Sequence, residues 1–66
     1  MRLWLNGAER EMPDGALLAD ALATLDVPAS GVAVAVDDDI VPRAAWAGYP
    51  LYDGVRVEVL TAVQGG

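Results

Sequence analysis

Leu3-Trp4-Leu5-Asn6-Gly7 opens the chain with a short apolar run followed by the strongest short-range signal for a β-hairpin. A type I′ turn needs φ > 0 at both central residues, and Asn followed by Gly meets that need at little steric cost. The residues Ala8–Met12 are therefore predicted to return as a second strand, which ends at Pro13-Asp14-Gly15. The chain is expected to begin with two antiparallel strands.

The segment from Ala16 to Leu25 has the spacing of an amphipathic helix, with apolar side chains at positions 17, 18, 21, 22 and 25. Asp14 lies near the start of this segment and is expected to accept hydrogen bonds from the free amides of the first turn. Pro28 ends the helix by about Val27. We expect the apolar stripe to pack on a sheet as core and not to bind a cofactor.

The run Val32-Ala33-Val34-Ala35-Val36 has β-branched residues at alternate positions and no polar residue, which is typical of an interior strand buried on both faces. Asp37-Asp38-Asp39 predicts a turn, after which Ile40-Val41 extends briefly. The segment Arg43–Tyr52 is expected to be irregular and to be anchored by two aromatic residues, Trp46 and Tyr49.

The segment Val55–Val63 alternates as a strand does, with one face formed by Val55, Val57, Val59 and Thr61 and the other by Arg56, Glu58, Leu60 and Ala62. The order of elements predicts an α+β fold, in which four to five strands form a mixed sheet with one main helix on one face. A right-handed crossover would lay that helix over Leu3, Leu5, Val57 and Val59. We expect one domain over residues 1–63 and a flexible tail over residues 64–66.

Composition excludes several classes of function. The 66 residues include 10 acidic and 4 basic side chains, for a net charge of −6, with no Cys and no His. Such a chain has no basic stripe for nucleic acid or an anionic membrane surface. It also has no thiolate nucleophile, no imidazole base and no cysteine or histidine ligand for a metal. A cytoplasmic protein that is monomeric when free is the resulting expectation, and free-standing catalysis is disfavoured.

Three features remain that could carry chemistry or binding. Asp37-Asp38-Asp39 lacks the ligand spacing of a calcium loop, so a solvated turn accounts for it better than a metal site. Trp4, Leu60 and Ala62 are predicted to point away from the core on the outer sheet face. They form either an ordinary scatter of exposed apolar residues or one apolar patch for docking.

The third feature is the end of the sequence, Ala62-Val63-Gln64-Gly65-Gly66. Two terminal glycines arise by chance in about one chain in two hundred, given a Gly usage of about 7%. A frayed end is the plain alternative. Because glycine has no Cβ, the pair can thread a narrow channel, and five extended residues reach about 17 Å. Gly66 would thus present a reactive carboxylate to the site of another protein.

Together these elements resemble the ThiS family, the ubiquitin-like (β-grasp) sulfur carriers of thiamin biosynthesis. The likeness covers essentially the whole chain in order, from the first strand and its Asn6-Gly7 turn to the Gly-Gly end. Its most specific part is Val41-Pro42-Arg43 followed by Trp46, since a Gly-Gly end is shared with other carriers and modifiers. We expect Arg43 and Trp46 to hold the loop together, with a surface contact by Arg43 as the alternative.

The resemblance implies a mechanism in which the protein is a co-substrate and not an enzyme. A ThiF-type adenylyltransferase would use ATP and magnesium, neither held by this chain, to convert the Gly66 carboxylate to an acyl-adenylate. A sulfur donor such as a cysteine desulfurase would replace AMP, and thiazole synthase would accept the sulfur from the thiocarboxylate. Gly65 has no side chain and would let the tail enter a narrow channel in the partner. The residues expected to contact partners are Trp4, Leu60, Ala62, Val63 and Gln64.

Ala16 stands where members of this family often carry Thr or Ser at the start of the helix, which leaves capping to Asp14. Trp4 is larger than the usual residue at its position and would alter the docking patch. Three other functions stay open: the small subunit of molybdopterin synthase, a ubiquitin-like modifier joined to lysines, and a β-grasp interaction module whose Gly-Gly is incidental.

Overall fold

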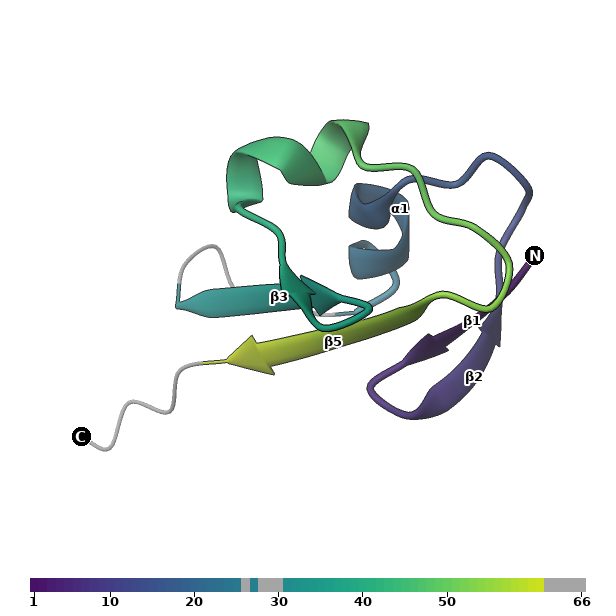
Figure 1. Ribbon diagram of the computed structural model, residues 1–66, viewed down its shortest axis with the longest axis horizontal. Coiled ribbons are helices and arrows are strands. Elements are labelled where there is room, and N and C mark those ends of the chain that lie inside the picture. The colour runs from purple at the N-terminus through teal and green to yellow at the C-terminus, as the bar shows by residue number, and fades with distance from the viewer. Residues whose placement is uncertain (26, 28–30, 62–66) are drawn as a thin grey trace.

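Five strands form one mixed sheet, and a helix and a 3₁₀ helix lie on the same face of it (Figure 1). The computed structural model describes residues 1–25, 27 and 31–61. In chain order the elements are β1 (Arg2–Leu5), β2 (Ala8–Glu11), α1 (Leu18–Leu22), β3 (Val32–Val36), β4 (Asp39–Ile40), the 3₁₀ helix η1 (Arg43–Gly48) and β5 (Arg56–Thr61).

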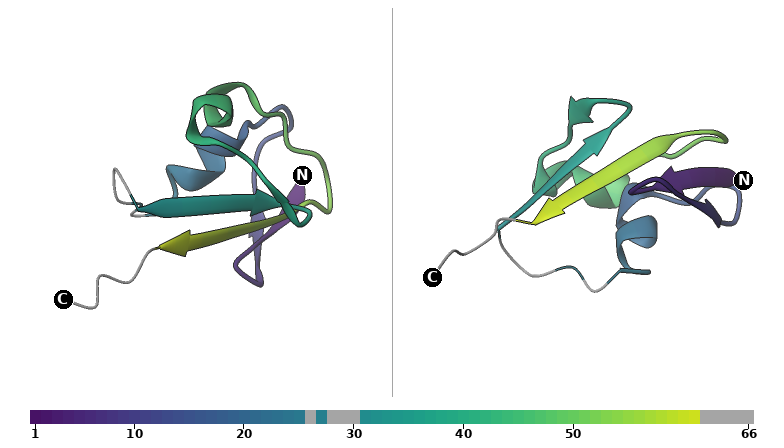
Figure 2. Two further views of the ribbon diagram at one scale, coloured as in Figure 1. Left: turned by 60° about the vertical axis from the view of Figure 1, so that its left-hand side comes forward. Right: turned by 90° about the horizontal axis from the view of Figure 1, so that it is seen from below.

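The order of strands in the sheet is β2-β1-β5-β3-β4, which places the last strand at the centre. β1 and β2 pair antiparallel through the predicted hairpin, where φ is 51° at Asn6 and 81° at Gly7. β5 runs parallel to β1 on one side and antiparallel to β3 on the other, and all three views show β3 and β5 side by side (Figures 1 and 2). This arrangement confirms the predicted α+β, β-grasp fold with a mixed sheet.

The core lies between the sheet and the two helical segments. Leu3 and Leu5 of β1 are 0% and 3% exposed, whereas Trp4 between them is 38% exposed, so the alternation predicted from the sequence is confirmed. The largest side chains that are fully buried come from β1, α1, β3, β5 and the turn before β5: Leu3, Leu18, Val34, Val36, Val55 and Val57. Within the described part of the chain, no helix is long and apolar enough to cross a membrane.

The helix is shorter than its apolar spacing predicted. α1 covers Leu18–Leu22, while Leu17 forms an isolated antiparallel bridge with Pro50 instead of a first helical turn. The amide of Leu18 donates to the carbonyl of Tyr49 at 2.8 Å, and that of Leu51 donates to Ala16 at 3.2 Å. Because this bridge holds residues 16 and 17 extended, the helix begins only at Leu18.

The predicted capping role of Asp14 is wrong. Its Oδ1 lies 3.2 Å from the N-terminal ammonium of Met1, which also donates to the carbonyl of Met12 at 2.7 Å. The start of the helix is capped instead by Asp20, whose Oδ2 accepts a hydrogen bond from the backbone amide of Leu17 at 2.8 Å. Asp20 lies in the first turn, where a carboxylate also interacts well with the helix dipole. The Ala16 position therefore needs no hydroxyl side chain.

The prediction that β3 is buried on both faces is also wrong. Val34 and Val36 are buried, but Ala33 on the opposite face is exposed and Ala35 is half-buried. The helical segments cover one face of the sheet only, as Figure 2 shows in the left-hand view. Alanine is small enough to stand on the uncovered face with little apolar area, so an uninterrupted apolar run did not indicate two buried faces.

The segment after β4 is more regular than expected, since residues 43–48 form the 3₁₀ helix η1. Trp46 on η1 is 9% exposed, and its indole Nε1 donates to the carbonyl of Val41 at 2.9 Å. The Arg43 guanidinium carbon lies 4.7 Å from the centre of the Trp46 ring, a cation–π distance. These two residues hold the loop together as predicted, and Tyr49 packs half-buried against the core.

β5 covers six residues of the predicted strand Val55–Val63. Its register against β3 runs from Val36 opposite Val57 to Val32 opposite Thr61. The predicted continuation through Val63, and with it the domain boundary before residue 64, lies outside the described residues and stays a prediction.

Leu18→Ala tests the core directly. Leu18 is completely buried, so the substitution should lower the free energy of unfolding by about 3 kcal/mol, from a total of about 3–10 kcal/mol for a chain of this length. Leu60→Ala is the matched control, because Leu60 is 64% exposed and should change stability by less than about 0.5 kcal/mol. Urea unfolding followed by circular dichroism measures both, and equal effects would contradict the assignment of the core.

Candidate functional site

The candidate site predicted from the sequence has two parts, the C-terminal residues and the outer face of the sheet. Of the residues predicted to act or to bind, Ala62, Val63, Gln64, Gly65 and Gly66 lie outside the described part of the chain. Their roles stay predictions. Trp4 and Leu60 are described, and both stand on the face of the sheet that carries no helix.

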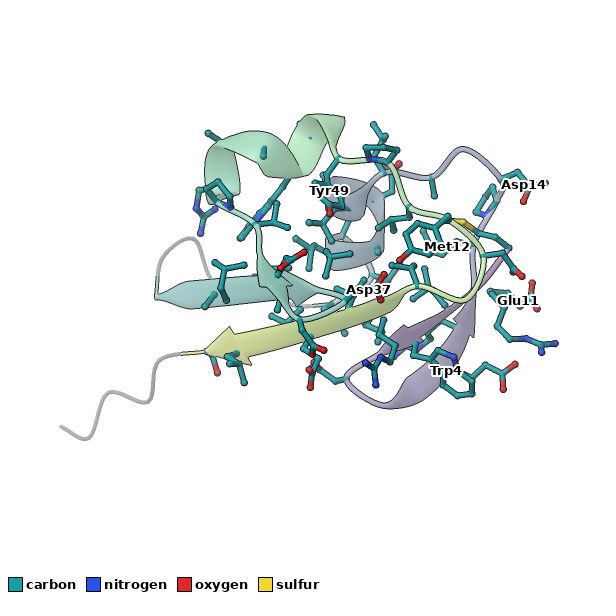
Figure 3. The ribbon with its side chains drawn as sticks, in the orientation of Figure 1. Trp4, Glu11, Met12, Asp14, Asp37 and Tyr49 are labelled. Atoms are coloured by element: carbon teal, nitrogen blue, oxygen red, sulfur yellow. The ribbon has the colours of Figure 1, made fainter. Side chains whose placement is uncertain are left out.

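That uncovered face is formed by alternate residues of all five strands. Figure 3 shows Trp4 on the side of the sheet away from α1. The pairing register extends this face across the sheet, since Trp4 lies opposite Glu9 on β2 and Arg56 on β5. Further along β5, Leu60 lies opposite Ala33 on β3. This face of the sheet therefore presents both apolar and charged side chains.

Trp4 and Leu60 belong to two separate hollows on this face. Trp4 borders one hollow together with Gly7, Arg56, Val57 and Glu58. Leu60 borders the other together with Gly31, Val32, Ala33 and Thr61. Leu60 is four residues further along β5 than the neighbour of Trp4, a distance of about 13 Å along a strand. The structure therefore places both residues on one face but does not join them in one apolar patch.

Ile40 is a further exposed residue on this face that the sequence analysis did not single out. It lies opposite Ala35 in the β3–β4 pair and is 69% exposed. Ala33 and Ala35 of β3, which are exposed and half-buried, lie between Ile40 on β4 and Leu60 on β5. Because alanine side chains are small, they rise little above the sheet between these two larger residues. The signal that would have found Ile40 is the two-residue turn Asp37-Asp38, which fixes the side-chain parity of β4 relative to β3.

The acidic triplet forms this turn. Asp37 and Asp38 have φ of 47° and 74°, the left-handed region that a type I′ turn needs. The Asp37 Oδ1 accepts from the backbone amide of Arg56 at 3.0 Å, and the Asp38 Oδ2 lies 3.7 Å from the Arg56 Nη2. Within the described ranges, no three acidic side chains are grouped as metal ligands. The solvated-turn interpretation accounts for these contacts.

The charges around Trp4 are also paired. The Arg2 guanidinium forms an ion pair with Glu9 and lies 4.0 Å from Glu11. All three side chains are substantially exposed, so each pair contributes about 1 kcal/mol or less to stability. They place charges of both signs on the same face of the β1–β2 pair as Trp4.

Comparison with known proteins gives one consistent answer. The model of the ThiS family matches residues 3–66. The sulfur carrier protein ThiS of Escherichia coli is 29% identical over 66 residues, which cover 100% of both chains. The sulfur carrier protein ThiS of Thermus thermophilus is 36% identical over 64 residues, which cover 97% of this chain and 98% of the relative. A crystal structure of the thiamine biosynthesis protein ThiS from Geobacter metallireducens superposes with a TM-score of 0.81 at 26% identity, with 100% of each chain covered.

The exposure of Trp4 can be measured by fluorescence, because the chain has only two tryptophans. Trp4 is 38% exposed and Trp46 is 9% exposed, so acrylamide should quench Trp4 strongly and Trp46 weakly. Trp4→Phe should therefore remove most of the quenchable emission and shift the remaining emission to shorter wavelength. A variant that quenches as the unsubstituted protein does would place the Trp4 ring in the interior instead.

Proposed function

This chain belongs to the ThiS family, and from that membership we propose that it is a sulfur carrier whose Gly66 carboxylate is adenylated and then converted to a thiocarboxylate. The observation that carries the proposal is the family match, which extends through Gly65 and Gly66. The thiocarboxylate donates its sulfur to formation of the thiazole ring of thiamin. The chain is in this role a co-substrate of other enzymes.

The chemistry follows from the weakness of a carboxylate as an electrophile. An oxygen of the Gly66 carboxylate attacks the α-phosphorus of ATP, and pyrophosphate leaves. The acyl-adenylate now carries AMP as a good leaving group. A persulfide on a sulfur donor such as a cysteine desulfurase displaces AMP to give an acyl disulfide, and a thiol then cleaves the S–S bond and supplies the two electrons that release the thiocarboxylate. A ThiF-type adenylyltransferase supplies the ATP site and the magnesium. This chain supplies the carboxylate and the binding energy that holds it in place.

The uncovered sheet face is the surface that best supports partner recognition. Leu60 at the end of β5 lies next to the start of the C-terminal residues and is 64% exposed. Apolar side chains of this size on a flat face contribute most when a partner removes them from water. Ile40 lies on the same face, across the alanines of β3. We assign Leu60 and Ile40, together with Trp4 in its own hollow, to partner docking.

Charge is expected to guide the encounter. The net charge of −6 attracts a partner whose binding rim is basic, and the attraction is screened by salt. Docking of thiazole synthase and of the adenylyltransferase to one face would make the two partners alternate, since both need the same carboxylate.

The proposed reaction is tested by intact-mass measurement. Incubation with ATP, magnesium, a ThiF-type adenylyltransferase, a sulfur donor and a thiol reductant should raise the mass by the difference between a sulfur and an oxygen atom. Deletion of Gly66 is the first control, and addition of one residue after Gly66 is the second. Both controls should show no gain in mass. A stable isopeptide adduct would identify a modifier instead, and an unchanged mass with an active partner would overturn the carrier proposal.

The docking assignment is tested by Leu60→Asp. Placing a charge at the centre of an apolar contact should raise the KM for the adenylation reaction about tenfold or more, with kcat little changed. Ala44→Asp is the matched control, because Ala44 is exposed on η1, on the opposite side of the sheet, and the added charge is the same. Equal KM values for the two variants would move the docking surface away from Leu60.

A further inference from the structure

The pairing between β1 and β5 ends before β5 does. Trp4 lies opposite Arg56 and Leu5 lies opposite Val57, and these are the two positions at which the strands pair. On its other side β5 pairs with β3 as far as Thr61. The second half of β5 therefore extends beyond the last residue of β1.

Asn6 adds one more connection at this point. Its backbone amide donates to the carbonyl of Val57 at 2.9 Å, which continues the regular ladder. Its side-chain Oδ1 accepts from the amide of Val59 at 2.7 Å. In a continuing parallel ladder, a backbone carbonyl of β1 would accept from Val59. The carboxamide oxygen of Asn6 takes the place of that carbonyl.

The side chain is needed because the backbone has already turned away. With φ of 51° at Asn6 and 81° at Gly7, the chain reverses into β2 directly after the Val57 contact. An Asn side chain is short enough to reach back to the neighbouring strand, and Asn tolerates the left-handed conformation of the turn. Asn6 thus adopts the backbone conformation that the hairpin turn needs, and its side chain adds one more hydrogen bond between the β1 end and β5.

We propose that Asn6 is a positioning residue for the reaction of the C-terminal carboxylate. By holding Val59 it adds a contact from the β1 side at a point where β5 otherwise pairs only with β3, shortly before the chain continues to Gly66. A fixed starting point lowers the ordering cost of placing the carboxylate against ATP in the partner's site. This role rests on the proposed function, while the hydrogen bond to Val59 is observed independently of it.

Two substitutions separate the side chain from the turn. Asn6→Gly keeps a residue that adopts φ > 0 freely but removes the acceptor for Val59. Asn6→Asp keeps both the turn and an acceptor oxygen at the same position. A lower kcat in the first variant and its recovery in the second would isolate the side-chain acceptor oxygen as the feature that matters.

The experiment combines hydrogen exchange with adenylation kinetics on the full chain. In Asn6→Gly, exchange of the Val59 amide should accelerate about fivefold relative to that of Glu58, which lies opposite Ala35 of β3. The kcat for adenylation by a ThiF-type enzyme should fall about two- to fivefold with little change in KM, because the docking face is untouched. Asn6→Asp should restore both values.

Three results would overturn the proposal. Val59 exchange that is unchanged in Asn6→Gly would remove the structural contact. Acceleration of all amides to the same degree would show a general loss of stability and no local positioning. Faster Val59 exchange with unchanged kcat would show a contact without a role in the reaction. Failure of the unsubstituted protein to be adenylated would instead remove the proposed function, and the exchange measurement would still test the Val59 contact.

Discussion

The parallel pairing of β1 with β5 is the constraint on which the rest of the structure depends. It joins the two ends of the described chain at the centre of the sheet through contacts on either side of Leu3: the amide of Trp4 donates to Val55 at 2.9 Å, and the amide of Gly54 donates to Arg2 at 2.7 Å. Parallel strands cannot be joined by a tight turn, so the chain between them must cross over the sheet. α1 and η1 lie in that connection, and both lie on one face of the sheet, so neither covers the opposite face.

Local features of the sequence predicted much of this fold. The Asn6-Gly7 hairpin and the alternation of β1 depend on turn chemistry and side-chain period, which are properties of a few adjacent residues. The extent of α1 was not predictable in this way, because its start is set by hydrogen bonds to Tyr49 and Leu51, about thirty residues further along the chain. The exposed face of β3 was missed for a similar reason, since only the complete fold shows which face the helices cover.

In the candidate site, too, local sequence patterns predicted some features, and others depend on the complete fold. Parity along β1 and β5 predicted that Trp4 and Leu60 would share the outer face, but their separation along the sheet depends on the register between the strands. The hydrogen bond between the Asn6 side chain and the Val59 amide joins residues 53 positions apart. Such a contact leaves no periodic pattern in the sequence, so it could not be predicted. Turn residues with carboxylate or amide side chains recur in this role, since Asp53 accepts from Arg2 at 2.7 Å and Asp37 accepts from Arg56 at 3.0 Å. Each supplies an acceptor where the backbone turns away from its neighbour.

β2 has a consequence of a different kind. Its four residues are all exposed, and three of them carry charge: Glu9, Arg10 and Glu11. This strand forms one border of the sheet, where unpaired backbone groups would otherwise template the addition of strands from other molecules. For a chain that is 55% hydrophobic, adding such a strand would require burying charges next to like charges on the incoming copy. The charged border strand therefore disfavours edge-to-edge addition of further copies, although the open sheet face beside it carries exposed apolar side chains such as Trp4 and Leu60.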